Sequence, residues 1–249
     1  GLRRFAFGLG KKVLLANAMG ELCTAFRDAQ SQSVLFFWLY AVAFSLQIYF
    51  DFSGYSDMAI GLGRIFGFQF RDYVYIPLGG NRCSKAKWLR NLAVIWLLTG
   101  LWHGASWNFV LWGALFGVLL MIEKLWLGNL LEKLPAVVRH VYVIFLVLIS
   151  FVIFNANGLS GVLADVGGLF GAGGLPLYTS EALYYLRSYG VLLVVCLIAA
   201  LPLGKRCYER VQNSKVMTVL EPAAAAALLV AVTASLVDGS FNPFLYFRF

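Results

Sequence analysis

The feature that most constrains this chain is a series of long apolar stretches that contain no charged residue. Asp, Glu, Lys and Arg are absent from residues 34–50, 141–154, 191–203 and 223–237. With their uncharged flanks, these stretches approach the roughly 17–25 residues that a helix needs to cross a bilayer core. The whole chain is 61% hydrophobic and 13% charged, far from the composition of a water-soluble domain. The sequence therefore predicts an all-α polytopic membrane protein.

The positive charges gather in short clusters between the apolar stretches. Residues 82–90 and 205–215 form the two densest clusters, and the positive-inside rule places such clusters on the cytoplasmic side. This arrangement explains the net charge of +8 without nucleic acid, and the chain has no motif of a nucleic-acid-binding fold. We therefore predict a multi-pass integral membrane protein that contacts membrane lipid and does not bind nucleic acid.

The order of apolar and polar stretches predicts where helices begin and end. Residues 5–18 are amphipathic with basic residues ahead of them, which suits a helix at the membrane interface. Residues 51–67 are interpreted as a separate short helix buried against protein, with Ser56 as its N-cap. Residues 157–180 are Gly-rich and nearly uncharged, as expected of an external loop. The expected spans are residues 33–50, 140–155, 189–203 and 222–237.

Residues 91–122 are the most informative segment, because no charged residue interrupts them. One straight helix of this length would be about 48 Å long, well beyond a hydrocarbon core of about 30 Å. Two glycines, a histidine and an asparagine lie near its middle, and these are poor lipid-facing residues. Basic residues flank both ends, so two half-depth helices that meet near His103 would return the chain to the cytoplasmic side. A single tilted span is the alternative.

His103 is the predicted catalytic residue, because an ionisable side chain inside a membrane segment is costly and marks function. Desolvation disfavours a charged imidazolium, and a neutral ring can take a proton from a hydroxyl as a general base. A histidine that only packs against a neighbouring helix is the alternative. The Gly-flanked break favours function, since exposed backbone there can bind a ligand. His140, at the start of a span, is interpreted as structural or snorkelling.

Polar and aromatic residues outside this position supply the remaining candidates. The cluster Asp51, Ser53, Tyr55 and Asp57 lies in an apolar region, where buried carboxylates need partners such as Arg64, Arg71 or a tyrosine hydroxyl. It is either a structural network or part of the site. The aromatic residues Tyr73, Tyr75, Trp102, Trp107 and Trp112 line a substrate tunnel or form an interfacial belt, and the belt is favoured for most. The predicted substrate-binding residues are Trp107, Asn108, Asp51, Tyr55 and Tyr75.

The sequence offers no signature of a metal or a bound cofactor. The four cysteines show no C-x-x-C spacing and the two histidines are far apart, so we expect free, packed thiols and no zinc site. The G-x-S-x-G elbow, the Walker A loop and the H-E-x-x-H motif are all absent. We therefore predict that no metal and no cofactor is bound.

Three stretches resemble the membrane-bound O-acyltransferase (MBOAT) family. They are Q-I-Y-F-D-F-S-G-Y-S-D-M-A at residues 47–59, R-D-Y-V-Y-I-P-L-G-G-N-R at residues 71–82 and L-T-G-L-W-H-G-A-S-W-N at residues 98–108. The run N-P-F-L-Y-F-R-F at residues 242–249 is also typical. The chain looks most similar to the bacterial branch of alginate O-acetyltransferases. The likeness covers essentially the whole chain but only the C-terminal half of a family member.

This resemblance implies an MBOAT-like helical bundle with broken or re-entrant helices around a buried histidine, in the bacterial inner membrane. His103 matches the histidine of the family's W-H-G motif. The implied function is O-acetylation of an exported, alginate-like polysaccharide, with a thioester (acetyl-CoA or a carrier-linked acyl group) as co-substrate. Periplasmic acyl-handling proteins are the implied partners. As a separate hypothesis, Asn108 or backbone N–H groups near Gly100 and Gly104 stabilise the oxyanion.

One departure from the family pattern bears on activity. Family members carry a tract resembling F-W-R-R-W-H-x-S, with a second functional histidine, between the positions matching Phe70 and Arg71. Here Phe70 runs directly into Arg71, so either a segment is missing or the protein is a non-catalytic transport or scaffold remnant of the same fold. We expect one membrane domain over residues 1–249, without the N-terminal helices of its relatives and without a segment at 70/71.

Overall fold

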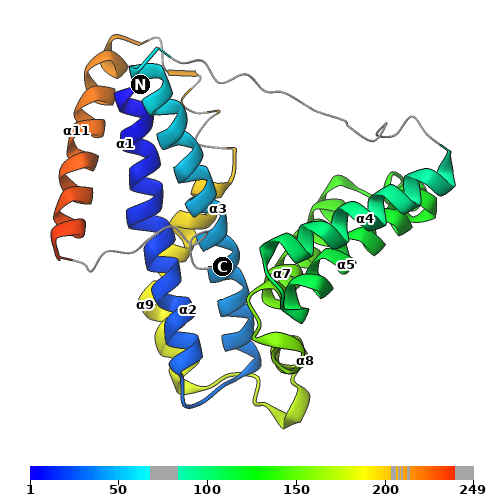
Figure 1. Ribbon diagram of the computed structural model, residues 1–249. Helices are drawn as coiled ribbons and strands as arrows, with labels where there is room; N and C mark the ends of the chain where they lie inside the picture. The colour runs from blue at the N-terminus through cyan, green and yellow to red at the C-terminus, as the bar shows by residue number, and fades with distance from the viewer. Residues whose placement is uncertain (68–83, 203–205, 207, 209, 212–213, 239–249) are drawn as a thin grey trace. The chain divides into compact units, whose positions relative to one another are not determined.

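The computed structural model describes residues 1–67, 84–202, 206, 208, 210–211 and 214–238 (Figure 1). Across these residues the chain is built from helices and their connections, and no strand occurs among them. The prediction of an all-α protein is confirmed. Tyr75 and the junction at residues 70/71 lie outside the described residues, as do Cys83 and Cys207.

Five of the described helical segments are long and apolar enough to cross a membrane, judged by length and composition. They are α3 (Val34–Ile65), the continuous run Trp107–Leu131, α7 (Ala136–Phe154), α9 (Ser180–Ala200) and the part Val216–Val237 of α11 (Lys215–Asp238). The multi-pass prediction is therefore confirmed. The expected spans at 189–203 and 222–237 start too late, because α9 and α11 continue toward the N-terminus through more polar turns and, in α11, through Pro222.

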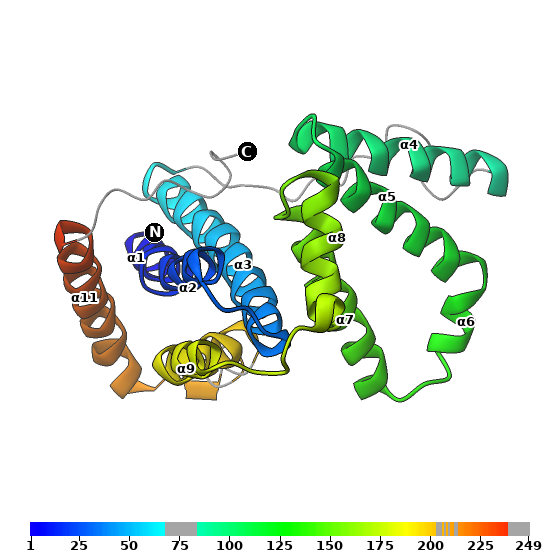
Figure 2. The ribbon, with the colours of Figure 1, turned by 90° about the horizontal axis from the view of Figure 1, so that it is seen from below.

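The chain divides into two compact units. The expectation of a single membrane domain stays a prediction. Unit 1 contains α1 (Leu2–Gly10), the π-helical turn η1 (Lys11–Ala16), α2 (Asn17–Asp28), α3, α9 and α11. Within it α3 contacts α1, η1, α2 and α9, and α11 contacts α1 and η1. Figures 1 and 2 both show α1 and α2 running beside α3.

This arrangement corrects the interfacial interpretation of residues 5–18. A helix that lies in the membrane interface would meet a spanning helix only at its end. Instead, α1, η1 and α2 form one helical run that packs on α3 through all three of its parts. The run can approach closely because Gly8 faces Gly54: a Cβ added to Gly54 would lie 2.7 Å from the Gly8 carbonyl oxygen. Small residues at such crossings let helix backbones touch.

The long helix α3 is a second correction. It begins at Ser33, whose Oγ accepts a hydrogen bond from the Phe36 N–H at 3.3 Å, and it continues to Ile65 without the expected break after residue 50. Ser56 therefore lies inside a helix and caps nothing. The expectation that this region packs on protein is confirmed, since Asp51 is only 3% exposed. The helix carries charged residues in its second half because partners from α1 and η1 meet them.

Unit 2 contains α4 (Lys85–His103), α5 (Trp107–Ile122), the π turn η2 (Glu123–Leu127), α6 (Gly128–Leu131), α7, α8 (Gly158–Leu169) and the 3-10 turn η3 (Ala172–Gly174). Within the unit α4 packs on α5, α5 on α7 and α8, and α7 on α8. The expected external loop at 157–180 is therefore wrong in part, because it includes α8. The prediction was based on the many glycines of this segment. Several of them, such as Gly171 at φ +76°, lie in the turns beside α8 and say nothing about the helix itself.

Candidate active site

The site is built around the break between α4 and α5. His103 is the last residue of α4, and α5 begins at Trp107. Gly104 between them has φ +154°, and a Cβ there would lie 2.7 Å from Cε2 of Phe109. A larger residue at this position would therefore strain the backbone and collide with a ring that belongs to the site. The predicted interruption next to His103 is confirmed.

The two helices return alongside each other as an antiparallel hairpin. A Cβ added to Gly100 would lie 2.5 Å from the Phe109 carbonyl oxygen, and one added to Gly113 would collide with the Trp96 carbonyl oxygen. These glycines bring the backbones of α4 and α5 into contact, as small residues do between membrane helices. The interpretation as one tilted span is therefore wrong, and the chain doubles back as the hairpin alternative requires.

The helices are longer than the half-depth pair that the sequence predicts. With 19 residues, α4 is about 28 Å long at 1.5 Å per residue, but its first six residues include Lys85, Lys87 and Arg90, and it is not among the helices apolar enough to cross a membrane. The run Trp107–Leu131 has 25 residues and could span by itself. His103 thus lies about 20 Å along the helix from Arg90, the last basic residue of α4. The predicted helix length was too short because only the uncharged residues from 91 onward were counted. The observed α4 also includes the basic segment that begins at Lys85. The depth of its uncharged part in the membrane stays a prediction.

His103 sits in a cluster of aromatic rings supplied by three helices of unit 2. Its ring centroid lies 5.0 Å from that of Trp102, 5.3 Å from Trp112 and 5.1 Å from Phe154. The ring of Phe109 is 6.2 Å away. The imidazole is half-buried, with part of its surface exposed. A partly dry position between aromatic rings offers little to stabilise a positive charge.

Asn108 holds this cluster together. Its side chain is 4% exposed, and its Nδ2 donates a hydrogen bond to the carbonyl oxygen of Phe154 at 2.8 Å. Phe154 ends α7, where carbonyl groups lack helical partners. Asn108 thereby fastens the start of α5 to the end of α7. Trp107, the other predicted neighbour, is 65% exposed and points away from the protein interior of unit 2.

The structural role of Asn108 leads to a prediction. We expect Asn108→Ala to lower the free energy of unfolding by about 1–3 kcal/mol, because it leaves the buried Phe154 carbonyl without its donor. Thermal unfolding of the purified protein in detergent micelles would measure this loss. Asn129→Ala, at an exposed position of α6, is the matched control and should unfold like the wild type. Equal melting temperatures for both variants would contradict the role of Asn108.

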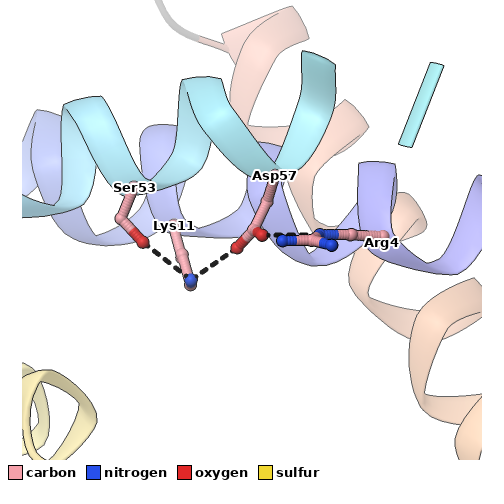
Figure 3. Close-up of polar contacts among 4 residues, drawn as sticks. All are labelled: Arg4, Lys11, Ser53 and Asp57. Atoms are coloured by element: carbon pink, nitrogen blue, oxygen red, sulfur yellow. Dashed lines mark hydrogen bonds and ion pairs between the residues drawn. The ribbon is translucent and has the colours of Figure 1, made fainter. Parts of the chain in front are cut away.

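The polar cluster on α3 finds its partners in a different place from the one predicted. Lys11 Nζ lies 2.6 Å from Oδ2 of Asp57 and donates to Ser53 Oγ at 2.9 Å, and Arg4 Nε donates to Asp57 Oδ1 at 2.9 Å (Figure 3). The partners therefore come from α1 and η1, and no ion pair with Arg64 is among these contacts. The sequence signal that could have found them is the presence of four basic residues in the otherwise apolar residues 2–16.

Asp51 is the most deeply buried member of this cluster. Its Oδ1 lies 2.5 Å from Lys12 Nζ, and both side chains are almost fully buried. The π turn η1 begins at Lys11, and a π turn rotates less per residue than an α turn, so adjacent lysines can both face α3. Tyr55 is 54% exposed. Asp51 and Tyr55 belong to unit 1 and His103 to unit 2, so their shared role in substrate binding stays a prediction.

The remaining candidates have structural explanations. His140 is exposed on α7, and its Nδ1 lies 2.6 Å from the Ala136 carbonyl oxygen, one turn earlier in the same helix. Cys23 and Cys196 are buried free thiols, as predicted for those two. Among the described residues, no three His, Cys, Asp or Glu side chains come together in a group that could hold a metal ion.

Comparison with known proteins identifies relatives of this chain. The model of the membrane-bound O-acyltransferase family matches residues 70–164, which include α4, the break, α5 and α7. The probable alginate O-acetylase AlgI of Pseudomonas putida is 32% identical over 298 aligned positions, covering 100% of this chain and 61% of the relative. The protein of the same name from Azotobacter vinelandii is 39% identical over 64% of this chain and 38% of the relative.

A further relative differs in the named substrate. The peptidoglycan O-acetyltransferase of Helicobacter pylori is 29% identical, covering 100% of this chain and 56% of the relative. The chain thus spans less than two-thirds of the length of these relatives. No solved structure matches it. The family match lies on the helices that surround His103, and similarity to the alginate O-acetylases extends over the whole chain. On these grounds the chain belongs to the membrane-bound O-acyltransferase family.

Proposed function

We propose that this protein transfers an acyl group, most simply acetyl, from a thioester to a hydroxyl of an exported polysaccharide, with His103 as the general base. The observation that carries the proposal is the position of His103, at a helix break inside an aromatic cluster, within the segment that matches the family model. Relatives named as alginate and peptidoglycan O-acetylating proteins support a polysaccharide acceptor.

The chemistry needs one group that accepts a proton and returns it. A neutral imidazole nitrogen of His103 takes the proton from the acceptor hydroxyl, and the oxygen attacks the thioester carbonyl carbon. The carbonyl oxygen becomes negative while the new C–O bond forms. The C–S bond then breaks, and the departing sulfur takes the proton from the imidazolium, which leaves a free thiol and a neutral histidine. The aromatic walls limit water and so favour transfer over hydrolysis.

The substrates follow from this reaction. The donor is a co-substrate thioester, acetyl-CoA or an acyl group on a carrier, and no tightly bound cofactor is required. The acceptor is an alginate-like polymer that leaves the cell through the inner membrane. Periplasmic acyl-handling proteins are the expected partners. The proposed substrate contacts are Trp107, Tyr75, Tyr55 and Asp51. Trp107 has an exposed indole beside the break, and Tyr75 lies in the family motif at residues 71–82.

A second candidate function is non-catalytic, as a transport or scaffold remnant of the same fold. One observation favours it: the alignment with the Pseudomonas putida protein runs over 298 positions, although this chain has 249 residues. The relative therefore carries residues that have no counterpart here. A missing stretch of this kind fits the absent histidine tract that the motif comparison predicts between Phe70 and Arg71.

Acyl transfer by the isolated protein separates the two candidates. The purified protein in detergent micelles would be mixed with isotope-labelled acetyl-CoA and an oligomannuronate acceptor, with a thioester-free reaction as the blank. We expect acetyl ester on the oligosaccharide and an equal amount of free thiol. In cells, deletion of the gene should lower the O-acetyl content of surface polysaccharides. Unchanged O-acetylation in the deletion strain, together with no transfer in micelles, would contradict the enzyme.

A further inference from the structure

One hydrogen-bond donor beside His103 meets no acceptor among the residues that the structure describes. The Nε1 atom of Trp112 is buried, and no acceptor within the described part of the chain takes its hydrogen bond. Buried polar groups are almost always paired, so an unpaired one needs an explanation. Inside a membrane the need is stronger, because no bulk water reaches the group and the lost bond costs several kcal/mol by order of magnitude.

The position of this indole connects it to the reacting histidine. The centroids of the Trp112 and His103 rings are 5.3 Å apart with an interplanar angle of 86°. Trp112 also packs edge to face on Phe154 at 5.3 Å and on Trp96 at 6.0 Å. These contacts join α4, α5 and α7, so the orientation of the indole is held by three helices. Such a donor is preorganised, which is the condition for stabilising charge that develops during a reaction.

Asn108 cannot easily fill the same role. The oxyanion hypothesis for Asn108 requires one of its two amide N–H groups to face the substrate, but the other donates to the Phe154 carbonyl oxygen at 2.8 Å and the side chain is only 4% exposed. Turning the amide toward a substrate would break the bond that fastens α5 to α7. The indole N–H of Trp112 has no such bond to lose, so binding a substrate oxygen there gains a hydrogen bond without breaking one.

We infer that the Trp112 Nε1–H donates a hydrogen bond to the carbonyl oxygen of the acyl group during transfer, next to His103; this inference rests on the proposed function. While the acceptor oxygen bonds to the carbonyl carbon, the carbonyl oxygen becomes negative and its hydrogen bond strengthens. The bond weakens again when the C–S bond breaks and the carbonyl is restored. Because the Nε1 atom is buried, a neighbouring side chain must move when the acyl group enters, and the ring of Phe154 borders both His103 and Trp112.

The test removes the N–H and keeps the ring. In the micelle assay with acetyl-CoA and oligomannuronate, we expect Trp112→Phe to lower kcat about 10²-fold, the usual loss when one oxyanion donor is removed. The KM for acetyl-CoA should change little, because the bond strengthens only as charge develops. Replacement of Trp112 by 3-benzothienylalanine, which exchanges N–H for sulfur at nearly constant shape, should cause the same loss. This second variant guards against a packing defect in the phenylalanine variant.

A binding measurement and a matched control complete the design. Acetonyl-CoA, a ketone analogue with a labelled carbonyl, should show a lower carbonyl stretching frequency on the wild type than on either Trp112 variant. Trp126→Phe makes the same change at an exposed position of η2 and should keep kcat near the wild-type value. The inference would be overturned if both Trp112 variants had the kcat of the wild type and the same carbonyl stretching frequency as the wild type. If His103→Ala still abolishes transfer in that case, the proposed function with His103 as the base is retained and only the role of Trp112 is rejected. If His103→Ala is also active, both the role of His103 and the role of Trp112 are rejected.

Discussion

Replacing His103 with alanine is expected to lower the rate of acyl transfer by about 10²–10⁴-fold, the contribution of a positioned general base. In the proposed mechanism, the variant loses the group that takes the proton from the acceptor hydroxyl and returns it to the departing sulfur. The measurement is ester formation from labelled acetyl-CoA in micelles, accompanied by the O-acetyl content of the polysaccharide in cells. Both should fall together, because the same imidazole serves every turnover.

Two further variants separate chemistry from structure. His103→Gln preserves size and some hydrogen bonding but cannot act as the base, so its activity should be as low as that of the alanine variant. His140→Ala removes the second of the two histidines in the sequence, and its ring lies exposed on α7. This control should transfer acetyl groups at the wild-type rate. All three variants should reach the membrane in wild-type amounts, which immunoblots of the membrane fraction would verify.

Wild-type acyl transfer by His103→Ala at normal membrane levels would refute the role of this residue. The cluster of Trp102, Phe109, Trp112 and Phe154 around it would then be ordinary packing. The converse result, complete loss in His103→Ala and full activity in His140→Ala, would leave no place for the transport or scaffold alternative. A protein that only conducts or recruits has no step that depends on proton transfer to one imidazole.

The second large effect is expected from Lys12. Replacing it with methionine removes the ammonium group that lies 2.5 Å from the buried Asp51 carboxylate in unit 1. Breaking one side of a buried ion pair costs about 3–5 kcal/mol, because an uncompensated charge remains. We therefore expect Lys12→Met to lose this amount of unfolding free energy, as measured by denaturation of the purified protein in micelles.

The adjacent lysine provides a matched control. Lys11→Met makes the same change one residue earlier, but Asp57 keeps its bond to Arg4 at 2.9 Å and the site is more exposed. Its loss should be much smaller. The double variant Lys12→Met with Asp51→Asn removes both buried charges and should recover most of the stability lost in the single variant. A double variant as unstable as the single one would show that the two side chains are not coupled.

The same double variant tests the predicted role of Asp51 in substrate binding. If Asp51 serves only to join α3 to η1, the neutral pair should keep acyl transfer near the wild-type rate once the protein is folded. If the carboxylate binds the acceptor or donor, activity should fall although stability has recovered. Comparing kcat and KM of this variant with those of Lys11→Met distinguishes the two roles.

Much of this architecture follows from local patterns of residues. Uncharged apolar stretches indicate spans because each residue in a lipid-facing helix must be compatible with hydrocarbon, which is a local requirement. The interruption beside His103 could be predicted for the same reason, since Gly100, Gly104 and Asn108 do not suit a continuous lipid-facing helix. Motif similarity placed His103 in a family segment before any fold was considered.

Tertiary contacts decided the rest. Whether α3 continues past Asp51 depends on lysines about 40 residues earlier in the chain, and no local pattern reports that pairing. Asn108 and Trp112 are four residues apart, yet the Asn108 amide donates to the end of α7 and the Trp112 N–H meets no acceptor among the described residues. Local sequence is enough to say which residues tolerate lipid, because transfer from water depends mainly on each side chain. Which polar groups form hydrogen bonds or ion pairs with one another depends on helices that are far apart in the chain. Only the folded protein therefore shows which polar groups have partners within the described residues and which are left for a ligand.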